Sequence, residues 1–135
     1  MEDYVIAQDP NVSEIYLYRN MTSTGGLLTL GEGANKLGIR SKEVEGKMGI
    51  DYVYPSSLQG LSTTLGIGNV IPQVPFSNLP KTTLFRINIK SLPACSLLPV
   101  LINGNYSIII PAYWMNVQEF DIRIKSTAPL WKLVR

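Results

Sequence analysis

The residue types that most often perform catalysis or hold metals are scarce in this chain. Its 135 residues include no histidine and a single cysteine, Cys95. Ser-His and Cys-His catalytic pairs, histidine metal ligands and multi-cysteine zinc sites are therefore excluded together. Cys95 stands between Ala94 and Ser96, and without a histidine base we interpret it as a small buried apolar residue.

Carboxylates and phosphate-binding loops are the remaining sources of chemistry. Glycoside hydrolysis needs two carboxylates held ~5–10 Å apart, and none of the ten acids is marked by its context. Glu119 and Asp121 would share one face of a strand. Arg123 and Lys125 would continue that face, which is typical of alternating surface charge. In the glycine-rich run 31–38, Gly38 is followed by Ile39-Arg40 rather than by the Lys and Ser or Thr of a phosphate loop. We therefore expect no enzyme, no cofactor and no metal site.

Aromatic side chains provide the best binding signal. Tyr16 and Tyr18 would share one face of a strand, and Tyr113 and Trp114 are adjacent. Exposed aromatic rows stack on bases or sugars, or anchor protein interfaces. The alternative, which we favour, is that these rings pack against a neighbouring sheet or loop. These four residues are the candidate aromatic binding face.

The charged residues are few and unevenly distributed. They make up 16% of the chain, against ~25% in an ordinary soluble domain. Residues 1–51 carry eight acids and five bases and residues 119–135 carry two and four, whereas residues 52–118 contain no acid and only three bases. Charges are depleted at the buried cores of interfaces, and low charge favours association. Either this interval lies against other subunits, or it forms a neutral, Ser/Thr-rich surface.

Alternation of apolar and polar residues predicts β-strands along much of the chain. The clearest pair is 97–102 and 105–110, joined by Asn103-Gly104, which predicts a hairpin with a type I′ turn. Residues 83–90 and 120–125 alternate with period two, so each is predicted to be a strand with one buried face. The shorter predicted strands are 4–8, 14–19, 113–117 and 130–134, the last held by Trp131 as a core residue.

Helix signals are sparse, and only residues 41–48 combine a capping-box-like start with helix-forming residues. Gly and Pro interrupt the chain elsewhere at short intervals. The sequence therefore predicts an all-β protein, a single domain over residues 1–135 built as a small antiparallel sandwich or jelly-roll-like barrel.

Residues 54–80 form a long interval rich in Pro, Gly and Ser. We predict an extended, mostly irregular arm or covering loop there. A structureless segment of this length is uncommon inside a compact domain, and where one occurs it is usually a functional loop, an arm or a linker. The interval is too apolar to lie in water, so it either covers its own domain or extends onto a neighbour. Its candidate interface residues are Leu58, Leu61, Leu65, Ile67, Val70, Ile71, Val74 and Phe76.

Together these features favour a non-enzymatic structural subunit of a repetitive assembly, such as a virion or phage capsid, decoration, head-fibre or connector protein. Its partners would be copies of itself or other structural proteins. The alternative is a small β binding module for carbohydrate or single-stranded nucleic acid. A net charge of +2 without a basic cluster argues against nucleic acid. The acidic start and the lack of an apolar run predict no signal peptide, no transmembrane segment and a virion or cytoplasmic location.

Overall fold

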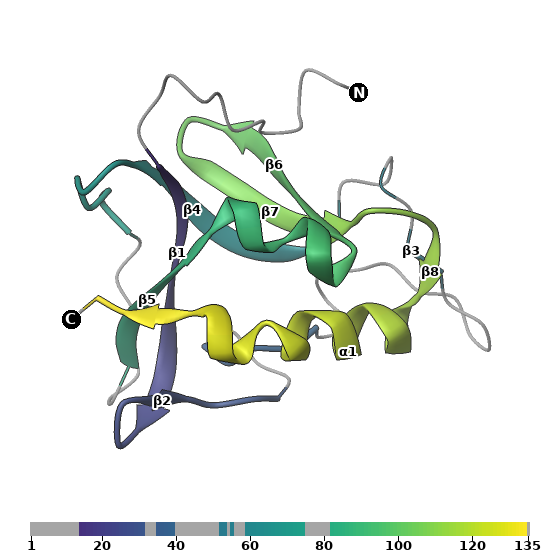
Figure 1. The fold of residues 1–135 in the computed structure, drawn as a ribbon, viewed down its shortest axis with the longest axis horizontal. Coiled ribbons are helices and arrows are strands. Elements are labelled where there is room, and N and C mark those ends of the chain that lie inside the picture. Colours follow the sequence, from purple (N-terminus) through teal and green to yellow (C-terminus); the bar gives the residue numbers. More distant parts are fainter. Residues whose placement is uncertain are drawn as a thin grey trace.

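The computed structural model describes residues 14–31, 35–39, 52–53, 55, 59–74 and 82–134. These residues form a mostly β structure with a seven-stranded antiparallel sheet in the order β6-β7-β4-β1-β5-β9, with β2 paired to β1 (Figure 1). A separate two-stranded pair is formed by β3 and β8. The predicted strands at 4–8 and helix at 41–48 lie outside the described residues.

The strands of the main sheet have between six and ten residues, except for β2 and β9, which have two each. The sheet strands are β1 (Ile15–Thr24), β2 (Leu27–Leu28), β4 (Leu61–Ile67), β5 (Thr82–Asn88), β6 (Leu97–Asn103), β7 (Tyr106–Pro111) and β9 (Lys132–Leu133). The remaining elements are β3 (Tyr52–Val53), β8 (Met115–Asn116), the helix α1 (Val117–Ser126) and the 3-10 turns η3 (Ile89–Ser91), η4 (Pro93–Cys95) and η5 (Ala128–Leu130).

The main core brings together side chains from one face of the sheet and from α1. Leu17 and Ile87 reach it from adjacent strands, and Phe120 and Ile124 reach it from the helix. Trp131 is buried as predicted, and its Nε1 donates to Thr127 Oγ1 at 2.9 Å. A helix therefore covers the inner face, and the predicted sandwich or jelly-roll arrangement is not confirmed.

The β6–β7 hairpin is confirmed, with a different turn. Asn103 pairs with Tyr106, so the loop consists of Gly104 and Asn105. Gly104 has φ +56°, whereas Asn105 is not among the described residues with positive φ. Positive φ at the first loop position alone matches a type II′ turn, because type I′ requires it at both positions. The predicted strand at 83–90 is also confirmed over β5, with Phe85 and Ile87 buried.

The prediction of a strand at 120–125 is wrong, because these residues lie in α1. The side chain of Asn116 caps the helix by accepting a hydrogen bond from the Glu119 backbone N–H at 2.7 Å. Phe120 and Ile124, four residues apart, are buried, whereas Ile122 is exposed. The spacing of Phe120 and Ile124 fits both a strand and a helix, and the Asn116 cap favours the helix.

The prediction of an irregular arm is wrong for residues 61–67, which form β4 between β7 and β1. The β-branched residues Thr63 and Thr64 favour an extended backbone, and both are buried within the sheet. Leu61 is fully buried, and Leu65 is half-buried and packs against the core. Leu58 and Phe76 lie outside the described residues.

The Asn116 cap yields a stability prediction. We expect Asn116→Ala to lower the free energy of unfolding by about 0.5–2 kcal/mol, because it removes the acceptor of the Glu119 N–H. Asn116→Asp keeps an oxygen there and is the matched control, with little loss expected. Urea unfolding followed by circular dichroism measures both, and equal losses in the two variants would contradict the assignment of the cap.

Candidate interaction surfaces

The predicted tyrosine face is largely closed. Tyr18 is fully buried on the outer face of the sheet, the face opposite α1. It lies over Gly66 of the neighbouring strand, where an added Cβ would meet Tyr18 Cε1 at 2.6 Å and Pro72 Cδ at 2.8 Å. The ring of Tyr18 and the ring of Pro72 thus share the space that glycine leaves. At Pro72, therefore, the interval 54–80 packs against its own domain.

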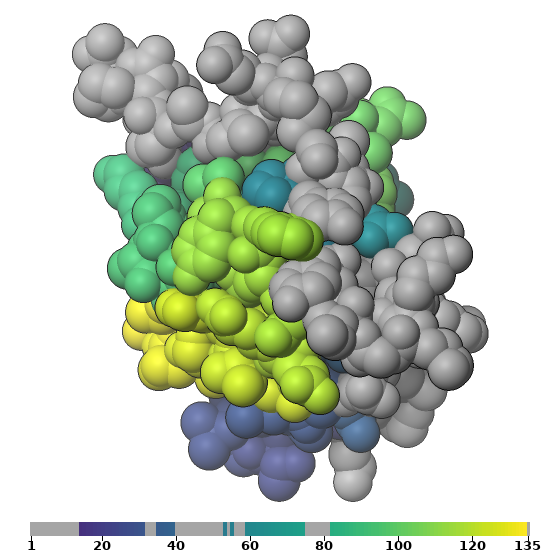
Figure 2. Space-filling view, turned by 90° about the vertical axis from the view of Figure 1, so that its right-hand side faces the viewer, coloured from purple at the N-terminus to yellow at the C-terminus, as the bar shows by residue number. Residues whose placement is uncertain are grey.

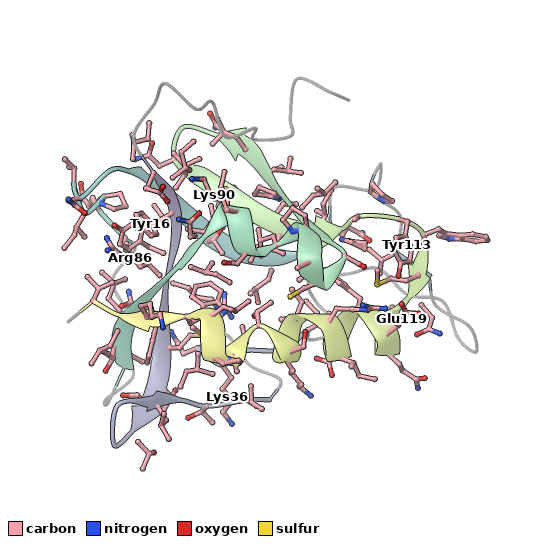
Figure 3. The ribbon with its side chains drawn as sticks, in the orientation of Figure 1. Tyr16, Lys36, Arg86, Lys90, Tyr113 and Glu119 are labelled. Atoms are coloured by element: carbon pink, nitrogen blue, oxygen red, sulfur yellow. The ribbon has the colours of Figure 1, made fainter. Side chains whose placement is uncertain are left out.

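Tyr16 is partly covered by Arg86, which comes from β5 on the other side of β1 (Figure 3). The guanidinium carbon lies 3.9 Å from the centroid of the Tyr16 ring, a cation–π contact. Arg86 Nη1 also donates to Tyr18 Oη at 3.3 Å. One face of the Tyr16 ring is thus occupied by this cation, and Tyr16 and Tyr18 do not form an open stacking surface.

Glu14 directly precedes β1 and joins three segments. Its Oε1 accepts from Lys90 Nζ at 2.9 Å and its Oε2 accepts from Asn88 Nδ2. Its backbone oxygen accepts from Gly68 N at 2.6 Å, directly after β4. The hydrogen bond from Lys90, followed by that from Asn88, lowers the pKa of Glu14 from its ordinary value.

An exposed apolar surface follows β4. Ile67, Val70 and Ile71 are 51%, 76% and 42% exposed. We call residues 67–71 the uncharged turn, because the sequence has no charged residue between Asp51 and Lys81. Gly68, at φ +64°, allows the chain to reverse there. Val74 is half-buried, so among the described members of the predicted interface the exposed ones are those of the uncharged turn.

Tyr113 and Trp114 form a second exposed surface, which we call the aromatic end. Their exposed fractions are 47% and 58%. Tyr113 Oη lies 3.4 Å from both Glu119 Oε2 and Arg123 Nη2, and these two side chains form an ion pair at 3.3 Å. Figure 2 views this end, with the yellow-green residues that precede α1 and its first turns near the centre. The aromatic end is therefore the open part of the predicted aromatic face.

The free edge of β6 is protected against pairing with another strand. Among the described residues, no strand pairs with the outer side of β6. Ala112 N donates to Ser96 O, so the next pairs, Leu97 with Pro111 and Pro99 with Ile109, have their backbone groups turned away from each other. Leu97 N donates to Leu92 O, and Pro99 has no N–H to offer.

No metal or membrane feature emerges from the described residues. They contain no group of three His, Cys, Asp or Glu side chains that could hold a metal ion. They also include no helix long and apolar enough to cross a membrane. Comparison with protein-family models, curated proteins and solved structures finds no match to this chain.

The cross-strand partners of Tyr16 and Glu14 were missed by sequence reasoning. The sequence placed Arg86 and Lys90 among the three bases of residues 52–118 and on the polar face of residues 83–90, but indicated no partner for either. Their contacts depend on the pairing of β1 with β5, and no local pattern specifies that register. The one usable signal was the alternation in residues 83–90, which placed Arg86, Asn88 and Lys90 on one polar face.

The protected edge yields a prediction. Pro99→Val restores an N–H that points away from β7, and we expect it to increase aggregation on concentration, measured by light scattering. Pro129→Thr also restores an N–H, in η5 and away from the β6 edge, and is expected to leave aggregation unchanged. Thermal unfolding checks that Pro99→Val stays folded. Equal scattering from folded Pro99→Val and wild type would show that Pro99 has no protective role.

The lowered pKa of Glu14 yields a second prediction. Because its pKa lies below the ordinary value, the contribution of this carboxylate to stability is present above that value and is lost as pH falls through the lowered pKa. NMR titration should show that Lys90→Met raises the pKa of Glu14 towards normal, and Asn88→Ala does so less. Lys125→Met, whose lysine pairs with Asp121, is the control and should leave it unchanged. An unaltered pKa in Lys90→Met would refute the assignment.

Proposed function

We propose that the protein is a non-enzymatic structural subunit of a repetitive assembly and that it associates with other subunits through the uncharged turn. The observation that carries this proposal is the exposure of Ile67, Val70 and Ile71 together on one short segment. Contiguous exposed apolar residues mark interaction sites far more often than single ones do. The neighbouring sequence supplies no charge that would oppose burial.

Virion proteins are the class that we propose, namely capsid, decoration, head-fibre or connector subunits. In such assemblies every copy buries the same surfaces, so depletion of charge is sustained over a large share of the sequence. The lack of acids in residues 52–118 fits this requirement. The proposed partners are copies of this chain or other structural proteins of the same assembly.

A second candidate function is the binding of carbohydrate or single-stranded nucleic acid. Trp114 favours it, because an exposed indole beside a tyrosine can stack on sugars or bases. Tyr16 and Tyr18 no longer support it, since one is covered by Arg86 and the other is buried. Fluorescence titration with oligosaccharides and oligonucleotides tests this function. A saturable change lost in Trp114→Phe would favour it, because Trp131 is buried and serves as the internal reference.

Association through the uncharged turn is tested with a charge placed at its most exposed residue. We expect wild-type protein to show a mass that rises with concentration in size-exclusion chromatography with light scattering. Val70→Asp should weaken association by at least ~10-fold, or about 1.4 kcal/mol, because burial would then desolvate a carboxylate.

The control for this experiment is Leu27→Asp. Leu27 is 75% exposed, close to the 76% of Val70, but belongs to β2. It carries the same new charge at the same exposure on another surface, so association should be retained. A wild-type chain that stays monomeric at every concentration and with every added structural partner would refute the proposed function.

A further inference from the structure

The two exposed surfaces lie at opposite ends of the molecule. Figure 1 is drawn with the longest axis horizontal, and the teal segment that follows β4 lies at its left end. Tyr113, labelled in Figure 3, lies at the right end beside Glu119 of α1. The uncharged turn and the aromatic end are thus separated along the longest dimension of the protein.

This placement bears on symmetry. A two-fold dimer buries one patch against its own copy, whereas a head-to-tail contact joins two different patches and repeats along the assembly. We propose that the aromatic end of one copy docks on the uncharged turn of the next copy. This inference rests on the proposed function and adds to it the second half of the interface and the type of symmetry.

The chemistry of the two surfaces is complementary. Trp and Tyr are the side chains most enriched among residues that dominate interface energies, and they act by packing against apolar surface. Ile67, Val70 and Ile71 provide such a surface without a charged residue among them. The aromatic end supplies the anchors, and the uncharged turn supplies the apolar surface that receives them.

Charged side chains flank both surfaces in matching numbers. Glu14 and Lys90 form an exposed pair next to the uncharged turn, since Glu14 O accepts from Gly68 N. Glu119 and Arg123 form a partly exposed pair next to Tyr113. Each end thus offers one acid and one base. In a head-to-tail contact Arg123 can face Glu14 of the next copy while Glu119 faces Lys90, so the rim is electrostatically matched.

The sheet edges leave the faces and ends of the domain as the sites of association. The β6 edge is protected by Pro99 and by the Leu97 to Leu92 hydrogen bond. At the other end of the sheet, β9 is only two residues long, and short edge strands are poor templates for pairing. A repeat built from surface contacts therefore fits this sheet better than one built by strand addition.

The test uses two variants that each block one surface, Val70→Asp and Trp114→Asp, at a concentration where the wild type is assembled. Both positions are exposed, and circular dichroism checks that each variant folds. We expect each variant alone to be monomeric. An equimolar mixture should form a dimer of one copy of each, because the intact aromatic end of the first meets the intact turn of the second.

Native mass spectrometry with one variant isotopically labelled identifies that mixed dimer. The matched control mixes Val70→Asp with the double variant, which together hold no intact turn, and should stay monomeric. A mixture of the two single variants that remains monomeric would overturn the proposal, as would normal assembly of Trp114→Asp. Both results leave the proposed function standing if the wild type assembles with itself or with another structural protein. A wild type that stays monomeric at every concentration and with every added structural partner removes the proposed function itself.

Discussion

Strand β1 pairs with β4 on one side and with β5 on the other, and this double pairing fixes the orientation of the rest of the structure. Its odd-numbered residues Leu17 and Met21 enter the core beneath α1. Its even-numbered residues Tyr16 and Tyr18 face the other side. Because side chains alternate along a strand, a shift of one residue would exchange the two faces. This single register accounts for the burial of Tyr18, for the contact of Tyr16 with Arg86 and for the position of Glu14.

Arg19 is the exception on the inner face, since it is a charged residue at an odd position and is only 6% exposed. Its Nη1 donates to Ser62 O at 2.8 Å and its Nη2 donates to Lys36 O at 2.9 Å. Hydrogen bonds of charged groups contribute about 1.5–3 kcal/mol each, which offsets part of the cost of burying the guanidinium. Arg19 thereby links β1, β4 and the segment 35–39.

Local patterns predicted the parts of this fold that depend on neighbours in sequence. The β6–β7 hairpin is indicated by its turn residues, and β5 is indicated by the period-two alternation of its own residues. Helix α1 was missed because Phe120, Ile122 and Ile124 fit a strand, and Asn116 with Glu119 was the capping signal that could have corrected it. Strand β4 was missed because its Ser, Thr and Gly content resembles a loop. The uncharged turn was within the predicted interface, whereas the Arg86 and Lys90 contacts required the long-range register.

The position of β1 in the sheet also governs how the chain can fold. Its register pairs Tyr16 with Asn88 and with Gly66, so its partners are made late in synthesis and lie far away in sequence. Long loops must close before these pairs form, and their entropy slows the search for the native topology. The β6–β7 hairpin, which needs only a two-residue loop, is free of that delay. We therefore expect the β6–β7 hairpin to form early and the pairing of β1 with β4 and β5 to be the slow step of folding.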